Sequence, residues 1–400
     1  MIVIGCRFGI IRKIIKPAFL ECLGNVLAAQ GPENFGRPLR ASWSSLLKHR
    51  SVRCATSGSG RQGTAERSSF EDFGARLVYQ IPKLRFGILY FAGEGFMKKQ
   101  GIVYGMVLLI VAVMVGAAEI LGENEIIFPE ITAIAVGALM APKLAWKTNR
   151  KRILGLIMIC AILGIGIVRF VPGPTWVKIT LAYAVAEMIF LKSGTSFAPM
   201  ISAIALPVLL GAESIVYPVA ALVLTSLILV CHMALVRGGI KEEASFVPVR
   251  ATGQDWTDAI VRLALVAVTA WIVLRWDSRF VIAPPLLVAF TEFSKRDSGA
   301  RKRPVIVVAA IGLCGLAGAI CRYVIHMSLD LPLTLAAVVS AVLMILILTK
   351  LKVYVPPAGA LCILPMLIPA EKVMGYPLQI LAGAALFMAL SLVAFPKKSI

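Results

Sequence analysis

The sequence predicts an all-α, polytopic membrane protein, a bundle of about twelve transmembrane segments built as two parallel six-segment repeats with proline-broken helices. Of its 400 residues, 59% are hydrophobic and 16% charged, and the mean hydropathy is +0.86. Soluble domains hold roughly 45 to 50% apolar residues. Long apolar runs follow one another from residue 97 onward, and proline landmarks recur at matched spacings in the two halves.

Composition divides the chain into four parts: a leader over residues 1–96, membrane repeats over 97–240 and 258–396, and a cytoplasmic linker over 241–257. The leader is rich in Arg, Ser and Gly, poor in acids and without a sustained period, so we expect it to be disordered. Two interpretations stay open for it. Either translation starts at Met97, which two lysines and a spanning run follow, or the leader is an organellar transit peptide. We favour the first.

Twelve apolar runs are expected as helical segments, because each is long and apolar enough to be buried in a membrane or inside a bundle. They are residues 102–120, 126–142, 153–171, 177–192, 196–212, 216–236, 258–276, 280–293, 304–326, 331–349, 354–370 and 374–395.

The second six runs repeat landmarks of the first six. In the fifth run of each half the order is Pro, Pro, Glu, Tyr-Pro, and the first two intervals are identical. The residues concerned are Pro199, Pro207, Glu213 and Tyr217-Pro218, then Pro357, Pro365, Glu371 and Tyr376-Pro377. Arg169 in VRFV matches Arg322 in CRYV, and Pro129 matches Pro284-Pro285. Four landmarks in the same order indicate an internal duplication.

Charge predicts the topology. The loops over residues 143–152 and 294–303 each carry five basic residues and occupy the same place in the two halves. Both should be cytoplasmic by the positive-inside rule. An even number of crossings per half then makes the repeats parallel and puts both termini in the cytoplasm. We expect a bacterial cytoplasmic membrane, or an organellar one if the leader is a transit peptide.

Segments two and five of each half are short and contain proline. A run of 14 residues such as 280–293 reaches about 21 Å as a helix, less than the roughly 30 Å of hydrocarbon. Backbone groups freed by proline survive at membrane depth only where protein or water satisfies them. We therefore place these four segments inside the bundle, beside a solute path. The predicted path residues are Pro129, Glu187, Thr195, Ser196, Pro199, Pro284, Pro285, Pro356, Pro357 and Gly359.

The run KVYVPPAGALCILPMLIP, preceded by FVIAPPLLVAF and a basic loop, resembles the membrane domain of the HPP family. Pro356-Pro357-Ala358-Gly359-Ala360 match that family's motif, whereas Val355 stands at the motif's histidine. The resemblance covers residues 256–395, and residues 102–236 only through the internal repetition. Because some family members are linked to nitrite transport, it implies a transporter-like role with nitrite or another small anion as substrate.

Two acids in apolar runs carry alternative interpretations. Glu187 lies near the centre of the fourth segment, where an unpaired acid costs roughly 2.5 to 3.5 kcal/mol. It is either a proton or substrate relay facing the interior, or an acid that reaches an interface from a short helix. For Glu292 an ion pair at the loop edge with Lys295 or Arg296 is favoured over a relay.

Charges near the outer ends form repeated pairs. Arg169 and Arg322 either attract an anion to the mouth of a path or snorkel to the interface. Glu213 and Glu371 are a cap for the next helix or a gate, and capping is favoured. Thr195 and Ser196, in KSGTS, precede a segment that starts with proline, and exposed amides there give a weak signal for anion binding.

These observations predict a transporter or channel for a small solute, and the expected solute is a small inorganic anion such as nitrite. The alternative is a non-transporting membrane scaffold or assembly component. We expect no enzyme, because no convergent set of nucleophile, metal ligands and acid or base is visible, and no cofactor or metal. Membrane lipid is the expected partner. Nucleic acid is excluded, because the basic residues behind the net charge of +20 cluster in loops without interleaved aromatics.

Overall fold

Every regular element in the part of the chain that the computed structural model describes, residues 99–243 and 246–396, is a helix. The leader expected over residues 1–96 lies outside these residues. Seven of the described helices are long and apolar enough to cross a membrane. They are Lys99–Leu121, α5 (Arg150–Phe170), α8 (Val216–Arg237), α9 (Gly253–Arg275), α11 (Pro304–Cys321, continued by the π-helical η6, Arg322–Ser328), α12 (Leu333–Leu351) and α14 (Tyr376–Ala394).

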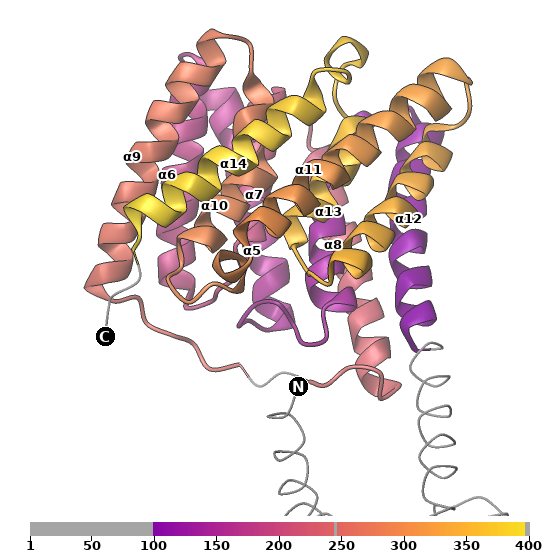
Figure 1. Cartoon of the computed structure of the whole chain (residues 1–400), viewed down its shortest axis with the longest axis horizontal. Coiled ribbons are helices and arrows are strands. Elements are labelled where there is room, and N and C mark those ends of the chain that lie inside the picture. Colours follow the sequence, from indigo (N-terminus) through magenta and orange to yellow (C-terminus); the bar gives the residue numbers. More distant parts are fainter. Residues whose placement is uncertain (1–98, 244–245, 397–400) are drawn as a thin grey trace, which may run out of the picture. The chain divides into compact units, whose positions relative to one another are not determined.

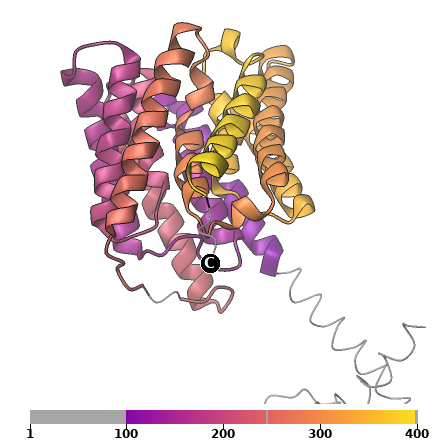
Figure 2. The ribbon, with the colours of Figure 1, turned by 60° about the vertical axis from the view of Figure 1, so that its left-hand side comes forward.

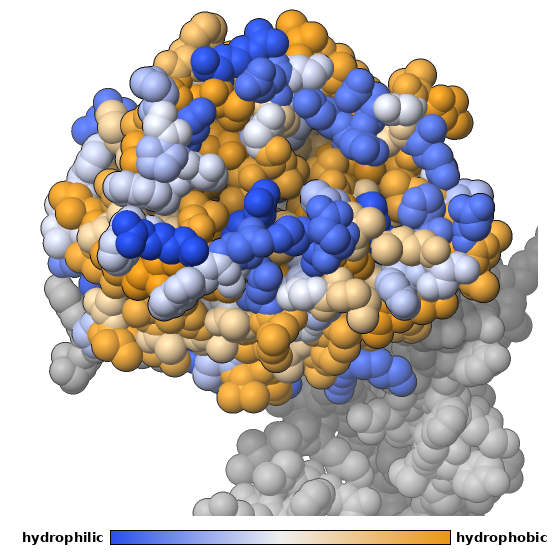
Figure 3. All heavy atoms as spheres, turned by 90° about the horizontal axis from the view of Figure 1, so that it is seen from above, coloured by the Kyte–Doolittle hydropathy of each residue, from blue (hydrophilic) through white to orange (hydrophobic). Residues whose placement is uncertain are grey.

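The long helices turn apolar side chains outward, as lipid-facing helices do. Leu109, Ile159, Val223 and Ile260 are all exposed large hydrophobic residues of these helices. Helix α6 (Thr175–Ser193) has a comparable length of 19 residues but carries three charged residues. In the view onto one end of the bundle, hydrophilic residues gather in patches across the end, and hydrophobic residues predominate around them (Figure 3). The helices are those of an integral membrane protein.

Four short helical stretches lie inside this ring of long helices. They are α4 (Glu130–Ala135) with the π-helical η3 (Val136–Met140), α7 (Pro199–Leu210), α10 (Pro284–Ser294), and α13 (Pro356–Ile363) with the 3-10 turn η7 (Leu364–Met366). Each has 11 or 12 residues and so rises about 16 to 18 Å, roughly half of a hydrocarbon core. All their residues are buried except Leu210 and Glu292, which confirms that these segments belong inside the bundle.

Most of the prolines predicted to break helices start them instead. Pro199, Pro284 and Pro356 are the first residues of α7, α10 and α13, and Pro129 precedes α4. Proline suits the first turn because the N–H it lacks would have no helical partner there. Pro285 and Pro357 are the second residues of α10 and α13, so only Pro207, inside α7, and Pro365, in η7, lie beyond the first turn of a short stretch. Shorter 3-10 turns connect elements at η2 (Asn124–Ile126), η4 (Arg279–Ile282), η5 (Gly299–Lys302) and η8 (Ala370–Lys372).

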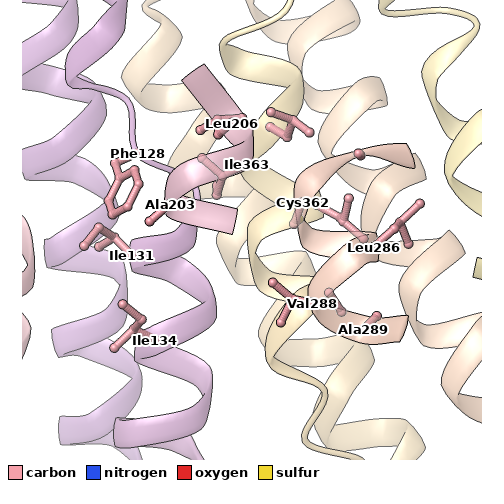
Figure 4. Packing of buried hydrophobic residues seen from close by; sticks show 14 of the residues in the cluster. Phe128, Ile131, Ile134, Ala203, Leu206, Leu286, Val288, Ala289, Cys362 and Ile363 are labelled. Atoms are coloured by element: carbon pink, nitrogen blue, oxygen red, sulfur yellow. The ribbon is translucent and has the colours of Figure 1, made fainter. Parts of the chain in front are cut away.

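The two halves of the chain pack with the same neighbours. Helix α5 contacts α6, α7 and α8, and α11 contacts α12, α13 and α14 (Figures 1 and 2). The short helices then cross between halves, because α4 packs on α13 and α7 packs on α10. Figure 4 shows the apolar side chains of these helices pointing at one another, with Phe128 and Ile131 beside Ala203, and Leu286 beside Cys362.

Two tyrosines hold the short helices in matching ways. The Tyr217 hydroxyl donates to the Ala203 carbonyl at 3.0 Å, and the Tyr376 hydroxyl donates to the Leu361 carbonyl at 2.7 Å. Each ring also meets a phenylalanine edge to face, with centroids 5.3 Å apart: Phe128 for Tyr217 and Phe280 for Tyr376. A buried hydroxyl thus satisfies a carbonyl of α7 and of α13 by the same contact.

Glycines allow the long helices to approach these short ones. A Cβ atom built on Gly164 of α5 would lie 2.6 Å from the Ile204 carbonyl oxygen, and one on Gly318 of α11 would lie 2.1 Å from that of Cys362. Because real Cβ atoms do not come within 3.0 Å of backbone, only glycine fits at either crossing.

Replacing Gly318 should therefore push α11 away from α13. We expect Gly318→Ala to lower the free energy of unfolding by about 1 to 3 kcal/mol through overpacking, measured by thermal unfolding in detergent. Gly155→Ala on α5 is the control, because a Cβ there meets nothing within 4 Å. Equal stability of the two variants would contradict the packing argument.

The two basic loops lie at one end of the bundle, since residues 145–147 and 294–300 line the same cavity. We expect single cysteines at Lys147→Cys and Lys302→Cys, in a background without other cysteines, to react with an impermeant maleimide from one face of the membrane. Glu213→Cys and Glu371→Cys should react from the other face. Labelling of positions 147 and 302 from opposite faces would overturn the arrangement.

Candidate functional site

A cavity of about 870 Å³ opens at the end of the bundle that carries the basic loops. Its rim is exposed at Lys147, Arg250 and Asp297. Charged side chains line it, seven basic and four acidic: Lys147, Arg250, Arg262, Lys295, Arg296, Arg303 and Lys352, with Asp255, Asp258, Glu292 and Asp297. The cavity therefore carries an excess of positive charge in a hollow where low-dielectric walls strengthen its field.

Both halves of the chain build the cavity walls. The first half contributes residues 194–196, just before α7, and the loop around Trp146. The second half contributes the beginnings of α9 and α13 and the end of α10. The sequence positions these parts locally: Thr252 and Asp255 form a capping box that starts α9, and Pro356 starts α13 at the cavity wall. Short helices leave room here that full-length helices would fill.

A buried ion pair joins the cavity to the bundle interior. Arg262 of α9 reaches Glu187 of α6 with two parallel bonds, Nε to Oε1 at 2.8 Å and Nη2 to Oε2 at 2.7 Å. The two side chains are only 6% and 4% exposed, yet Arg262 also lines the cavity. The fork geometry is the strongest form of such a pair. Glu187 is thus neither alone nor at an interface.

Hydroxyl groups of α10 and α6 complete the polar network. Arg262 Nη1 donates to Ser294 Oγ at 3.2 Å, and Thr291 Oγ1 donates to Glu187 Oε1 at 3.3 Å. The Tyr183 hydroxyl lies 2.8 Å from Thr291 Oγ1. Three helices from both halves therefore meet at this pair, and every member of the network has a partner, as buried polar networks require.

Glu292, an acid of the cavity wall, is bonded to a tryptophan and not to the basic residues predicted as its partners. Glu292 Oε1 accepts a hydrogen bond from Trp146 Nε1 at 2.9 Å, and the ion pair expected with Lys295 or Arg296 does not form. Arg296 Nη2 donates instead to Asp258 Oδ1 at 3.1 Å. Burial lowers the pKa of Lys295, and the nearby charge of Glu292 partly opposes this.

A smaller cavity of about 450 Å³ lies at the opposite end. It is lined by the beginning of α6, the end of α7 and the end of α9, including Trp176, Leu209 and Arg275. The larger cavity touches the other ends of α6 and α9 and the residues just before α7. The Glu187–Arg262 pair, which bonds α6 to α9, is the polar contact between them.

The predicted path residues divide into two groups. Thr195, Ser196 and Pro356 line the large cavity, and Glu187 lies directly behind Arg262. The polar groups of the hydroxyl residues are already bonded: Ser196 Oγ accepts from the Lys147 amide at 2.8 Å, and the Thr195 amide donates to Ser193 Oγ at 3.1 Å. Their amides and hydroxyls therefore shape the turn before α7.

The remaining path residues lie away from the cavity. Pro129, Pro199, Pro284, Pro285, Pro357 and Gly359 are buried among the short helices and are not among the residues that line either cavity. Gly359 lies against α4, since a Cβ on it would come within 2.9 Å of the Thr132 carbonyl oxygen. These residues therefore pack against neighbouring helices and do not border a cavity.

The repeated charges lie at the end opposite the large cavity. Arg322 Nη1 donates to the Pro365 carbonyl at 2.7 Å, where α13 gives way to η7, so it satisfies a backbone acceptor. Arg169 is exposed. Glu213 and Glu371 are exposed too, and neither caps the following helix: the first amide of α8, that of Val216, donates to Ser214 Oγ at 3.0 Å, and α14 begins without a side-chain cap. The favoured capping role is therefore wrong.

Sequence reasoning missed Arg262, Lys295 and Arg296 as parts of the site, and also the buried acid Glu130. The available signal for Arg262 was charge balance, since an arginine and a glutamate within two membrane segments of one chain tend to pair.

Comparisons with known proteins give no relative: no family model matches the chain, and no curated protein or solved structure matches it.

The ion pair makes a strong prediction for stability. Arg262→Met should lower the free energy of unfolding by about 3 to 5 kcal/mol, because it leaves the Glu187 charge buried without a partner. Unfolding in detergent measures this. The double variant Glu187→Met/Arg262→Met should regain most of the loss, and Glu243→Gln, which removes the exposed pair with Arg150, should change stability by less than about 1 kcal/mol. A double variant as unstable as the single one would count against a paired charge.

Proposed function

We propose that this protein is a membrane transporter for a small inorganic anion, with nitrite as the first candidate. The observation that carries the proposal is the large cavity, because it is hollow, excess-positive and walled by both halves. An anion entering it meets Arg and Lys side chains that bind oxyanions through charge and hydrogen bonds. The likeness of residues 356–360 to the HPP motif adds nitrite to the proposal, since Pro356 borders the cavity.

The proposed architecture is two parallel repeats of six segments. Each of the twelve expected runs overlaps with one of the helices described above. The matched contacts of Tyr217 and Tyr376, and of Gly164 and Gly318, support the duplication. The shared end of the two basic loops supports parallel rather than inverted repeats. By the positive-inside rule the large cavity then faces the cytoplasm of a bacterial cell.

Alternating access is the mode of transport that this conformation favours. The large cavity opens at one end, and the short helices inside the bundle are close-packed with one another, as the apolar contacts of Figure 4 illustrate. A state open at the other end would require the helices around the pair to separate there, where the smaller cavity already lies. Exchange between two such states moves a solute without an open pore.

A non-transporting scaffold is the second candidate. The observation in its favour is that Glu187 is fully paired and the interior between the short helices is filled with apolar side chains. A scaffold needs no hollow lined by seven basic residues, and for this reason we rank it second.

Flux into proteoliposomes decides between the two. We expect the full chain to carry at least one of nitrite, nitrate, formate and chloride faster than protein-free vesicles. Charge reversal at the rim, Arg303→Glu, should slow the flux several-fold at low salt and less at high salt, because screening weakens steering.

Arg237→Glu is the matched control, since Arg237 is exposed but is not one of the cavity's lining residues. No flux of any of the four anions would remove the substrate claim and leave the scaffold. Equal slowing by both reversals would mean that the cavity is not where the anion enters.

A further inference from the structure

Glu130 is a buried acid that lies outside both cavities. It is the first residue of α4, its side chain is 1% exposed, and its only side-chain partner is Ser202 of α7, whose hydroxyl donates to Oε1. The other carboxyl oxygen, Oε2, is buried and has no hydrogen-bond partner in the described residues. An acid in this position needs a physical explanation, because buried polar atoms are nearly always satisfied.

No positive charge lies close enough to neutralise Glu130. It forms no salt bridge within the described residues, although five other pairs do. Among the helices packed on α4, α7 and α13 contain no lysine, arginine or histidine, and the two such residues of α8, His232 and Arg237, lie near the other end of that helix from Tyr217. An ionised carboxylate without a partner is very costly in such surroundings, so the group takes up a proton instead.

No titratable group around Glu130 supplies a positive charge that could neutralise the carboxylate in place of the proton. Tyr217 of α8 lies near it, but the Tyr217 hydroxyl is bonded to the Ala203 carbonyl. Cys160 of α5 and Glu125 of η2 share this neighbourhood, and Cys362 of α13 is bonded to Ser340. None of these groups is a cation, and Glu125 is a further acid.

Comparison with Glu187 shows why the two acids differ. Both are buried on helices of the first half, but Glu187 has the Arg262 guanidinium as a hydrogen-bonded counter-charge. Glu130 has one hydroxyl. If Pro129 matches Pro284, the second half has Pro285 where the first half has Glu130. If Pro199 matches Pro357, it has Ala360 where the first half has Ser202. The second half therefore has no acid at the position that matches Glu130.

We propose that Glu130 is the proton-binding site of the transporter, and that one proton bound there accompanies one anion across the membrane. The proposal rests on the proposed function. Glu130 takes up a proton from water when the contact of α4 with α7 and α13 opens, and holds it while the helices are packed. The carboxylate reforms, and the proton returns to water, when the same contact opens toward the other side. Charge balances, because a monovalent anion and a proton cross together.

Proteoliposomes test the coupling. For one proton per anion, a gradient of about one pH unit should hold an anion accumulation ratio of about tenfold. Nitrate and chloride are the probes, because their conjugate acids are too strong to cross the bilayer as neutral molecules. Glu130→Gln imitates the protonated acid, so it should keep nitrate or chloride exchange and lose the accumulation. Glu125→Gln is the matched control and should accumulate as the unchanged protein does.

Three outcomes overturn the proposal: accumulation by Glu130→Gln equal to that of the unchanged protein, accumulation that follows a sodium gradient instead of a pH gradient, and exchange without any accumulation in the unchanged protein. Infrared spectroscopy tests the proton itself without any transport. At neutral pH the unchanged protein should show a carbonyl band of a protonated carboxylic acid that Glu130→Gln lacks and Glu125→Gln retains. If no anion moves but the band is present, the transport function fails and proton binding at Glu130 stands. If the band is absent at every pH at which the protein is folded, Glu130 is not the site.

Discussion

Contact between glycine and backbone determines how this bundle is built. Gly164 and Gly318 bring α5 and α11 against the carbonyls of α7 and α13, next to Pro207 and Pro365. A larger side chain at either glycine would separate the helices, and the freed carbonyls near the prolines would lose their protein surroundings. Half-length helices are therefore stable at this depth only because long helices can lie directly on them. The tyrosine contacts to Ala203 and Leu361 act in the same direction by bonding further carbonyls.

The cavity follows from the length of those helices. Because α7 and α13 rise only about half of a hydrocarbon core, the chain before each of them leaves space at one end, and charged loops occupy its walls. Full-length helices at these places would bury Arg262 and Lys295 without access to water, at high cost. The ion pair with Glu187 then separates this wet region from the apolar packing beyond it. The charged cavity and the apolar interior of the bundle thus meet at the Glu187–Arg262 pair.

Local properties of the chain were predictable from its sequence, and pairings were not. The four short, proline-marked runs were correctly placed inside the bundle, because length and hydrophobicity decide burial segment by segment. The partner of Glu187 was missed, because Arg262 lies 75 residues away in the sequence and no local pattern connects the two. Matched spacing also misled: Glu213 and Glu371 recur in the sequence, yet both are exposed and cap nothing. Glu130 was not predicted as a site residue, because only three-dimensional packing shows that no cation approaches it.

The Glu187–Arg262 pair has a consequence for biosynthesis. During translation at about 5 to 20 residues per second, Glu187 leaves the ribosome some 4 to 15 s before Arg262, which lies 75 residues later. Throughout that interval the α6 segment carries an acid without its counter-ion, so it must wait protonated or beside the insertion machinery rather than in free lipid. Chains halted before residue 262 and cross-linked to that machinery would reveal this waiting stage. The first half therefore gains the counter-charge for its buried acid only when the second half has been made.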